Sequence, residues 1–145
     1  MHLTRYADYT MRLLIHLAVQ PDGMSTIQDI AKRYGISRAH LMKVANQAVQ
    51  AGYVEAVRGR AGGLRLSRPA AKISIGDVLR TTEDCTLVEC FDPSSNRCPI
   101  TEGCGLRLML RKALDAYFAV LDGYSLADAV ERRSLLVQLL DLKAG

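Results

Sequence analysis

All four cysteines of the chain lie in one stretch of 20 residues that begins at Cys85 and ends at Cys104. The last three, Cys90, Cys98 and Cys104, are separated by seven and then by five residues. Prolines, a glycine and a Ser-Ser-Asn run lie between them, and these residue types favour a loop. Thiolates bind soft metals such as zinc, copper(I) and the iron of iron–sulfur clusters. Three thiols on one loop therefore indicate one chemical site.

Spacing alone leaves four interpretations of this loop open: an iron–sulfur cluster, a zinc site, a redox-active pair of thiols, or inert buried cysteines. Structural zinc sites usually contain cysteine pairs separated by about two to four residues. The gaps here are four, seven and five residues, and no histidine lies in the loop, so the spacing favours a cluster over zinc. The redox pair would be Cys85 with Cys90, or Cys98 with Cys104.

The composition indicates a small globular protein. The 145 residues suffice for one domain, or for one small domain with a helical extension, and 49% of them are apolar. No apolar run approaches the roughly 20 residues of a membrane span, and the N-terminus has no apolar signal-peptide region. We therefore expect a cytoplasmic protein without membrane contact. Its cysteines would stay reduced and would serve as ligands or sensors rather than disulfides.

The net charge of +4 is unevenly distributed along the chain. Residues 1–72 carry 11 Lys and Arg against 4 Asp and Glu, whereas the remainder carries 8 against 11. A basic first half suits a polyanion such as nucleic acid. An acidic second half argues against nonspecific binding of polyanions over the whole surface.

Three helices are expected in the basic half. Apolar residues recur at helical spacing over residues 4–19. Ser25 and Gln28 form a capping-box pattern before a short helix that ends at Gly35, and a third helix follows over residues 38–51. Two short helices joined by a tight turn are typical of a helix-turn-helix, in which the second helix reads DNA. The contacts expected at this recognition helix are Ser37, Arg38, His40 and Lys43.

A hairpin is expected directly after the recognition helix. Residues 53–57 and 64–67 alternate as strands, and the turn between them is rich in glycine and arginine. A hairpin in this place is a wing, and its tip arginines, Arg58 and Arg60, suit phosphates or a narrow minor groove. An ordinary hairpin with solvated charges is the alternative, but the helix pair and the charge asymmetry favour DNA binding.

The second half contains a long helix that is apolar over most of its circumference, from residue 106 to residue 121. A short helix capped by Ser74 precedes the cysteine loop, and Ser125 with Asp128 caps another short helix after the long one. The chain has little left to cover the long helix, so we expect a homodimer built on it.

These expectations describe a mostly α protein. It is a winged helix-turn-helix with a two-stranded β wing, a cysteine loop and a long C-terminal dimerisation helix. The expected divisions are a DNA-binding domain over 1–72, a connecting helix and cluster-binding loop over 73–104, and a dimerisation helix with a C-terminal tail over 105–145.

Four stretches of the chain resemble the iron–sulfur winged-helix transcription regulators of the NsrR and IscR kind, and the resemblance extends over nearly the whole length. They are Leu-Thr-Arg-Tyr-Ala-Asp-Tyr at the start, Gly-Ile-Ser-Arg-Ala-His-Leu-Met-Lys-Val on the recognition helix, Val-Arg-Gly-Arg-Ala-Gly-Gly-Leu-Arg-Leu on the wing, and Leu-Val-Glu-Cys with Cys-Pro-Ile-Thr-Glu-Gly-Cys-Gly-Leu in the loop. The combination is more specific than any one of these motifs.

The resemblance implies a set of cluster ligands. The last three loop cysteines of the family bind the cluster, which here are Cys90, Cys98 and Cys104, whereas Cys85 matches no family ligand. One branch adds a histidine three residues after the third cysteine, but that position here is Arg107, which cannot bind metal. In the nitric-oxide-sensing branch, an aspartate on the first helix of the other subunit completes the cluster. The matching residue is Asp8, which the pattern alone would assign to a solvent-side ion pair with Arg5 and Arg12.

The function implied is that of a repressor that senses nitric oxide. Its 4Fe–4S form would bind double-stranded operator DNA as a homodimer and release it on nitrosylation. The alternatives are an iron- or redox-sensing regulator of the same family and a zinc-stabilised winged-helix DNA-binding protein. We find no nucleophile–base pair, nucleotide loop or paired carboxylates in the sequence, so we expect no enzymatic activity.

Overall fold

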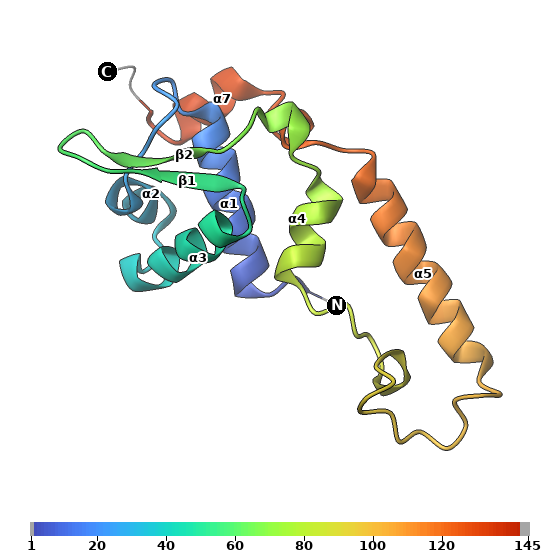
Figure 1. Ribbon diagram of the computed structural model, residues 1–145. Coiled ribbons are helices and arrows are strands. Elements are labelled where there is room, and N and C mark those ends of the chain that lie inside the picture. Colours follow the sequence, from blue (N-terminus) through green and yellow to red (C-terminus); the bar gives the residue numbers. More distant parts are fainter. Residues whose placement is uncertain (1, 143–145) are drawn as a thin grey trace.

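The computed structural model describes residues 2–142 and has a mostly helical fold with one two-stranded sheet (Figure 1). The elements in chain order are α1 (Arg5–Val19), α2 (Ile27–Tyr34), α3 (Arg38–Gln50), β1 (Val54–Val57), β2 (Gly63–Leu66), the 3-10 turn η1 (Ala70–Lys72), α4 (Ile75–Thr82), the 3-10 turn η2 (Glu89–Phe91), α5 (Gly105–Asp122), α6 (Leu126–Ala129) and α7 (Arg133–Leu139).

Helix α1 is the central element of the core. The hydroxyl of Thr4 accepts a hydrogen bond from the amide of Ala7 and caps the helix. Leu13, Leu14 and Leu17 are buried at helical spacing. Helices α3 and α4 both pack against α1, from the two sides that Figure 1 shows.

The helix-turn-helix is formed by α2 and α3, with one correction to the predicted cap. Thr26, not Ser25, is the N-cap of α2, and its hydroxyl accepts from the amide of Asp29 at 3.1 Å. Ser25 instead pairs its backbone with Leu64 of the wing. Gly35 ends α2 in the left-handed conformation (φ 62°), which glycine adopts without a steric cost.

The wing is an antiparallel hairpin in which Val54 lies opposite Leu66 and Val57 lies opposite Gly63. The loop at its tip turns through Gly59, which has a φ of 114°. At Gly62 a side chain would collide with the backbone of Val57, so only glycine fits there. The tight tip therefore depends on the glycines that the sequence placed between the two strands.

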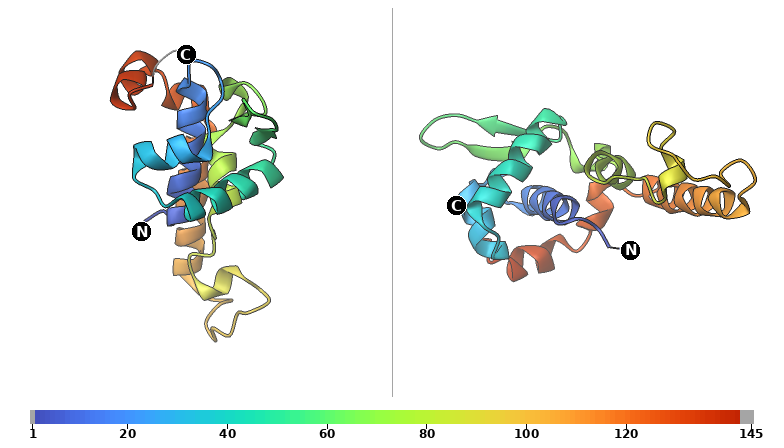
Figure 2. Two further views of the ribbon diagram at one scale, coloured as in Figure 1. Left: turned by 90° about the vertical axis from the view of Figure 1, so that its left-hand side faces the viewer. Right: turned by 90° about the horizontal axis from the view of Figure 1, so that it is seen from below.

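Helix α5 projects from the rest of the molecule and carries the cysteine loop at its far end (Figures 1 and 2). Its C-terminal end packs on α4, and the chain then returns so that α6 and α7 lie against α1. In Figure 2 the wing and the cysteine loop lie at opposite ends of the molecule. Within residues 2–142, no helix combines the length and the hydropathy that a membrane span requires.

Candidate nucleic-acid interface and cysteine loop

The recognition helix α3 presents a polar face to solvent. Leu41, Val44 and Ala45 anchor it to the core, so the remaining positions face outward. Four predicted contacts are exposed at or near the start of this helix: Ser37, Arg38, His40 and Lys43. Ser37 is the N-cap by position, but its side chain makes no capping hydrogen bond and is therefore free to donate elsewhere.

The wing presents its arginines at its tip. Arg58 and Arg60 are both exposed, and neither forms an ion pair with any residue of the described chain. The body of the wing differs, because Arg65 pairs with Glu55 across the two strands and Arg68 lies over the ring of Tyr53 at 5.3 Å. The unpaired positive charge of the wing is therefore at its tip, where a phosphate backbone would meet it.

A hollow that the sequence did not predict lies between the helix-turn-helix and the wing. A cavity of about 330 Å³ is lined by the start of α2, the start of α3 and the wing, including Thr26, Gln28, Arg38 and Gly63. The Thr-x-x-Asp pattern was the signal that could have placed the start of α2 correctly.

The cysteine loop folds mainly on its own backbone and side chains. The side chain of Asn96 accepts from the amide of Cys98 at 3.0 Å, and the hydroxyl of Thr101 donates to the carbonyl of Cys98 at 2.7 Å. Cys90 is buried, Cys98 and Cys104 are half-buried, and all four cysteines are free thiols. The three predicted ligands thus lie on one loop, and the structure does not gather them around one point.

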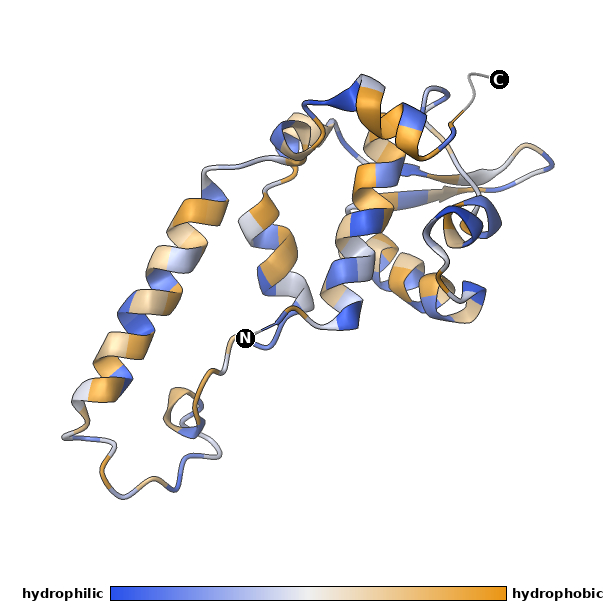
Figure 3. Cartoon of the chain, turned by 180° about the vertical axis from the view of Figure 1, so that it is seen from behind, coloured by the Kyte–Doolittle hydropathy of each residue, from blue (hydrophilic) through white to orange (hydrophobic). Residues whose placement is uncertain are grey.

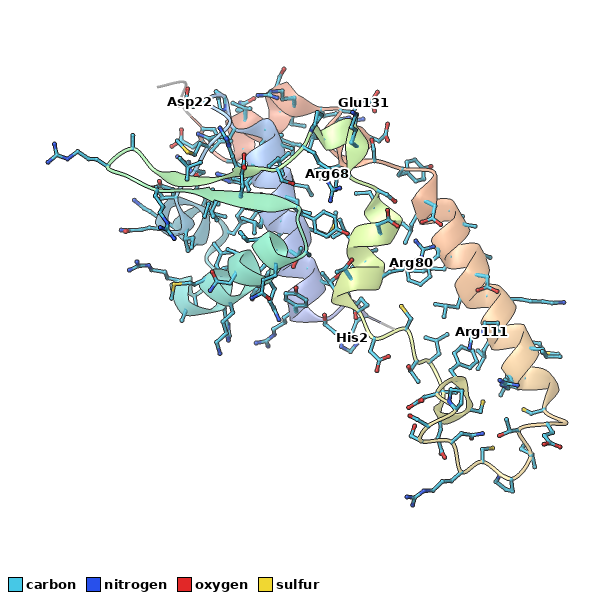
Figure 4. All side chains as sticks on the ribbon, in the orientation of Figure 1. His2, Asp22, Arg68, Arg80, Arg111 and Glu131 are labelled. Atoms are coloured by element: carbon cyan, nitrogen blue, oxygen red, sulfur yellow. The ribbon has the colours of Figure 1, made fainter. Side chains whose placement is uncertain are left out.

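Two arginines of α5 fasten this loop to the helix. The guanidinium of Arg107 donates to the carbonyl of Cys90 at 3.3 Å, and that of Arg111 lies 3.9 Å from the ring centre of Phe91. Figure 4 shows Arg111 reaching from α5 toward the loop. Cys104 occupies the N-cap position of α5 without a side-chain capping bond. The N-terminus of α5 and these arginines form a positive environment, which suits an anionic group.

Cys85 lies apart from the other three cysteines in chemical character. It lines an apolar cavity of about 530 Å³ between α4, α5 and the N-terminal residues. Burial, together with the carboxylates of Asp84 and Glu83, raises the pKa of its thiol, although Arg80 opposes the shift. A raised pKa makes a thiol harder to deprotonate and so a weaker metal ligand, which agrees with the absence of Cys85 from the predicted ligand set.

The donor set of the loop is tested by its chemistry. In residues 2–142 no group of three His, Cys, Asp or Glu side chains lies close enough together to hold a metal ion. Thiolates bind zinc and the iron of iron–sulfur clusters alike. The three free thiols of this loop are therefore donors of the kind that an iron–sulfur cluster takes.

Asp8 lies in the first turn of α1 and is paired with Arg12 in this chain. The guanidinium of Arg12 donates from Nε to Oδ1 at 3.0 Å and from Nη2 to Oδ2 at 2.8 Å, and both side chains are about two-fifths exposed. Arg5, the other predicted partner, makes no such contact in the described chain. The structure thus does not bring Asp8 together with the cysteines of its own chain.

The outward recognition helix and the arginine-tipped wing define a DNA-binding transcriptional regulator of the winged helix-turn-helix class. A family model described as Rrf2, iron-dependent transcriptional regulator, matches residues 3–132. The chain therefore belongs to the Rrf2 family. It is a transcriptional regulator of the NsrR type and not an enzyme, as the sequence predicted.

Relatives and solved structures agree with this assignment. The chain is 49% identical over 145 residues to the HTH-type transcriptional regulator NsrR of Bacillus subtilis (strain 168), with 99% of each chain covered. It superposes on T. potens IscR with a TM-score of 0.73 at 25% identity, covering 91% of this chain and 88% of that one. The TM-score with CymR, the global cysteine regulator of B. subtilis, is 0.70 at 25% identity, covering 91% and 98%. These structures confirm the predicted fold.

Proposed function

We propose that this regulator is a homodimeric repressor whose grip on operator DNA depends on a 4Fe–4S cluster and ends on exposure to nitric oxide. Cys90, Cys98 and Cys104 would hold the cluster, and Asp8 of the other subunit would complete it. The observation that carries the proposal is the placement of three free thiols on one loop at the end of the projecting helix α5. The resemblance to the nitric-oxide-sensing regulators supplies the signal.

We assign the DNA contacts to two exposed surfaces. On the recognition helix and its cap they are Ser37, Arg38, His40 and Lys43, and on the wing they are Arg58 and Arg60. The first four would reach the major groove, and the wing arginines would meet phosphates or the adjacent minor groove. In this scheme residues 1–72 read DNA, residues 73–104 connect and bind the cluster, and residues 105–145 form the dimer.

An exposed apolar stripe on α5 supports the homodimer. Leu106, Met109 and Val120 are 59%, 68% and 62% exposed, and Ala113 and Ala116 complete the stripe between them. The spacings alternate between three and four residues, so these side chains share one face of the helix. Figure 3 shows apolar colour along α5 where the helix stands away from the other elements. Water-exposed apolar area of this kind marks an interface.

The stripe is also complementary to itself. In two antiparallel copies that cross between Ala113 and Ala116, each alanine faces the other alanine and each Met109 faces a Val120. Small residues at the centre let the two helices approach closely, and a two-fold axis generates both halves of the contact.

This crossing would bring the cysteine loop of one subunit toward the N-terminus of the other. The residues that precede α1 lie against the second half of α5, because Leu3 lines the same cavity as Tyr117 and Phe118. In an antiparallel pair, the loop end of one α5 lies beside the second half of its partner. This arrangement agrees with the reach of Asp8, in the first turn of α1, across to the opposite loop.

Two alternative partners for Asp8 provide a switch. Arg12 holds both of its carboxylate oxygens in the single chain, and the opposite cysteine loop would hold it in the loaded dimer. When bound, the cluster would supply irons with which nitric oxide reacts. The carboxylate of Asp8 would be its weakest ligand, because iron holds oxygen less firmly than thiolate sulfur. If Asp8 returned to Arg12, the contact between α1 of one subunit and the cysteine loop of the other would be lost. The recognition helices would then lose the separation of about 34 Å that two half-sites require.

Anaerobic purification followed by DNA binding tests this function. We expect coloured protein with about four irons per subunit, whose operator affinity falls at least about tenfold on titration with nitric oxide. Asp8→Ala should lose most of this response, whereas Asp22→Ala, which removes an exposed carboxylate far from the loop, should retain it. A response to oxygen or to an iron chelator but not to nitric oxide would instead indicate an iron or redox sensor. Colourless protein that contains zinc would contradict the cluster.

A further inference from the structure

Helix α5 is held firmly at its C-terminal end and weakly elsewhere. The amide of Ile75 donates to the carbonyl of Tyr124 at 3.0 Å, and the amide of Leu126 donates to the carbonyl of Ile73 at 2.8 Å. These two backbone bonds join the segment after α5 to the segment before α4. Toward the cysteine end, the apolar cavity of about 530 Å³ separates α5 from the residues that follow α4.

Arg80 links α4 to α5 through two hydrogen bonds and an aromatic contact. Its guanidinium donates to both carboxylate oxygens of Asp122, at 2.6 and 2.7 Å, and lies 4.3 Å from the ring centre of Phe118. The hydrogen bonds from Arg80 also lower the pKa of Asp122, so the pair stays ionised. Figure 4 shows Arg80 pointing from α4 toward α5. The side chain of Arg80 thus contacts Phe118 and Asp122, which lie one turn apart on the same face of α5.

The approach of the two helices at this point is close. A Cβ at Gly76 would collide with the carboxylate of Asp122, so the ion pair sits directly on the backbone of α4. Phe118 is the buried residue of α5 among those the structure describes. The backbone bonds fix where α5 ends, but a second point along the helix is needed to fix its direction, and Arg80 with Phe118 supplies that point.

From Phe118 to Gly105, α5 extends about 20 Å toward the cysteine loop, at 1.5 Å per residue. A rotation of about 10° at the joint would therefore move the loop by about 3 to 4 Å. In a dimer that pairs through α5, the same rotation would change the separation of the two winged helices.

We propose that Arg80 is the positioning residue that sets the direction of α5 relative to the winged helix-turn-helix, and through it the spacing of the two recognition helices. The inference rests on the proposed function for its effect on DNA binding, but the direction of α5 does not depend on that function. The contact between Arg80 and Asp122 differs from an ordinary surface ion pair in three ways. It is bidentate, Arg80 also packs on the ring of Phe118, and Gly76 lets the pair lie directly against the backbone of α4.

Distance measurement between spin labels tests the direction of α5 directly. Labels would be placed at Met42 on α3 and Leu108 on α5, which are 44% and 63% exposed, by a chemistry that leaves the cysteines untouched. Dilution with unlabelled chain restricts the signal to distances within one subunit. We expect one narrow distribution in the wild type and a broader or shifted one in Arg80→Gln. Arg80→Lys, which keeps the charge but not the planar fork, should lie between them.

Asp77→Asn is the matched control, because Asp77 is a second and longer contact of Arg80 at 3.5 Å. It should leave the distance distribution as in the wild type. An Arg80→Gln distribution identical to that of the wild type would overturn the inference, whatever the cluster does.

Operator binding by the same variants tests the consequence. Arg80→Gln should reduce the affinity gained on cluster loading by about fivefold or more, with cluster absorbance and dimer mass unchanged. If the distance distribution changes and the full gain survives, the role of Arg80 in spacing the recognition helices is wrong. If the wild type itself gains nothing from the cluster, the proposed function fails, and the distance measurement still decides whether Arg80 directs α5.

Discussion

Asp8 and His16 illustrate how the same helix treats two ionisable side chains differently. Asp8 stays near the surface of α1 in an exchangeable pair with Arg12, so it can change partners at little cost. His16, two turns further along the helix, is fully buried, and its Nε2 lies 3.1 Å from the hydroxyl of Ser25. Its Nδ1 has no hydrogen-bond partner within the described chain. The first side chain suits a switch, and the second suits a neutral core position.

Burial lowers the pKa of His16 to about 4, with Arg33 adding to the shift and Asp29 opposing it. His16 is therefore protonated below about pH 6.5 in the unfolded chain but only below about pH 4 in the folded chain. Stability that is fully present above pH 6.5 should fall by about 2 to 3 kcal/mol between about pH 6.5 and 4.5.

Urea unfolding at a series of pH values checks this expectation. His16→Gln should remove most of the loss in this range, even though it lowers stability at pH 7. The carboxylates with lowered pKa, such as Asp122 and Asp128, lose their contribution below that range and do not obscure the result. A wild-type stability that stays flat from pH 7 to 4.5 would show that His16 is protonated in the folded protein.

At the scale of elements, the wing is the part whose function separates most cleanly from its structure. Glu55 and Arg65 brace the two strands, and Arg58 at the tip makes no ion pair within residues 2–142. We expect Arg58→Ala to leave the fold intact and to weaken binding to all DNA sequences alike. Because each phosphate contact contributes about 0.9 to the slope of log affinity against log salt, the dimer should lose about 2 from that slope.

Titration of operator and of unrelated DNA over a range of salt concentrations measures this slope. Arg132→Ala is the control, because Arg132 is an exposed arginine beside α6 and α7 and not on the wing. A slope that Arg58→Ala leaves unaltered would exclude the tip of the wing from the backbone contacts.

The helices and strands of this fold were predictable because the residues that determine each one lie within or beside it. Helical periodicity, caps such as Thr4, and Gly35 at the end of α2 lie within a few residues of what they determine. The false cap at Ser25 arose because Ser25 is drawn into a backbone pair with Leu64, which lies 39 residues away in the chain. Local pattern carries no information about such a partner.

The joint between α4 and α5 was unpredictable for the same reason. Arg80 and Asp122 lie 42 residues apart, and nothing in their local sequence distinguishes this pair from other charges. The family resemblance named Cys90, Cys98 and Cys104 as ligands, and the structure places them on one loop without making them converge. In the proposed function, completion of that site would depend on a second chain, which no pattern within one chain can position.

At the scale of the whole molecule, the two functional surfaces lie at opposite ends of one subunit (Figure 2). The wing and recognition helix face one way, and the cysteine loop extends the other way on α5. A signal at the loop can therefore reach DNA only through the direction of α5 or through contacts with a second subunit. The proposed dimer on the exposed stripe of α5 would bring both routes together, since the loop leads directly into the helix that carries the stripe.

The dimer itself can be tested by a charge at the centre of the stripe. Ala116 would face Ala113 of the other subunit, so Ala116→Glu would bury two carboxylates near the two-fold axis. We expect the dissociation constant of the dimer to rise about a hundredfold or more, corresponding to about 3 kcal/mol. Sedimentation over a concentration series measures this change, and helicity by circular dichroism shows whether each subunit stays folded.

Ala119→Glu is the matched control, because Ala119 is also exposed on α5 but lies outside the stripe, about 60° around the helix from Ala116 and about 100° from Val120. It should remain a dimer. The Ala116→Glu subunit should keep its affinity for a single half-site and lose the gain from binding two, since a lone winged helix-turn-helix reads only one. If Ala116→Glu leaves the dissociation constant of the dimer unchanged, the two subunits must contact each other through another surface. The proposed reach of Asp8 across to the opposite cysteine loop would then have no structural basis.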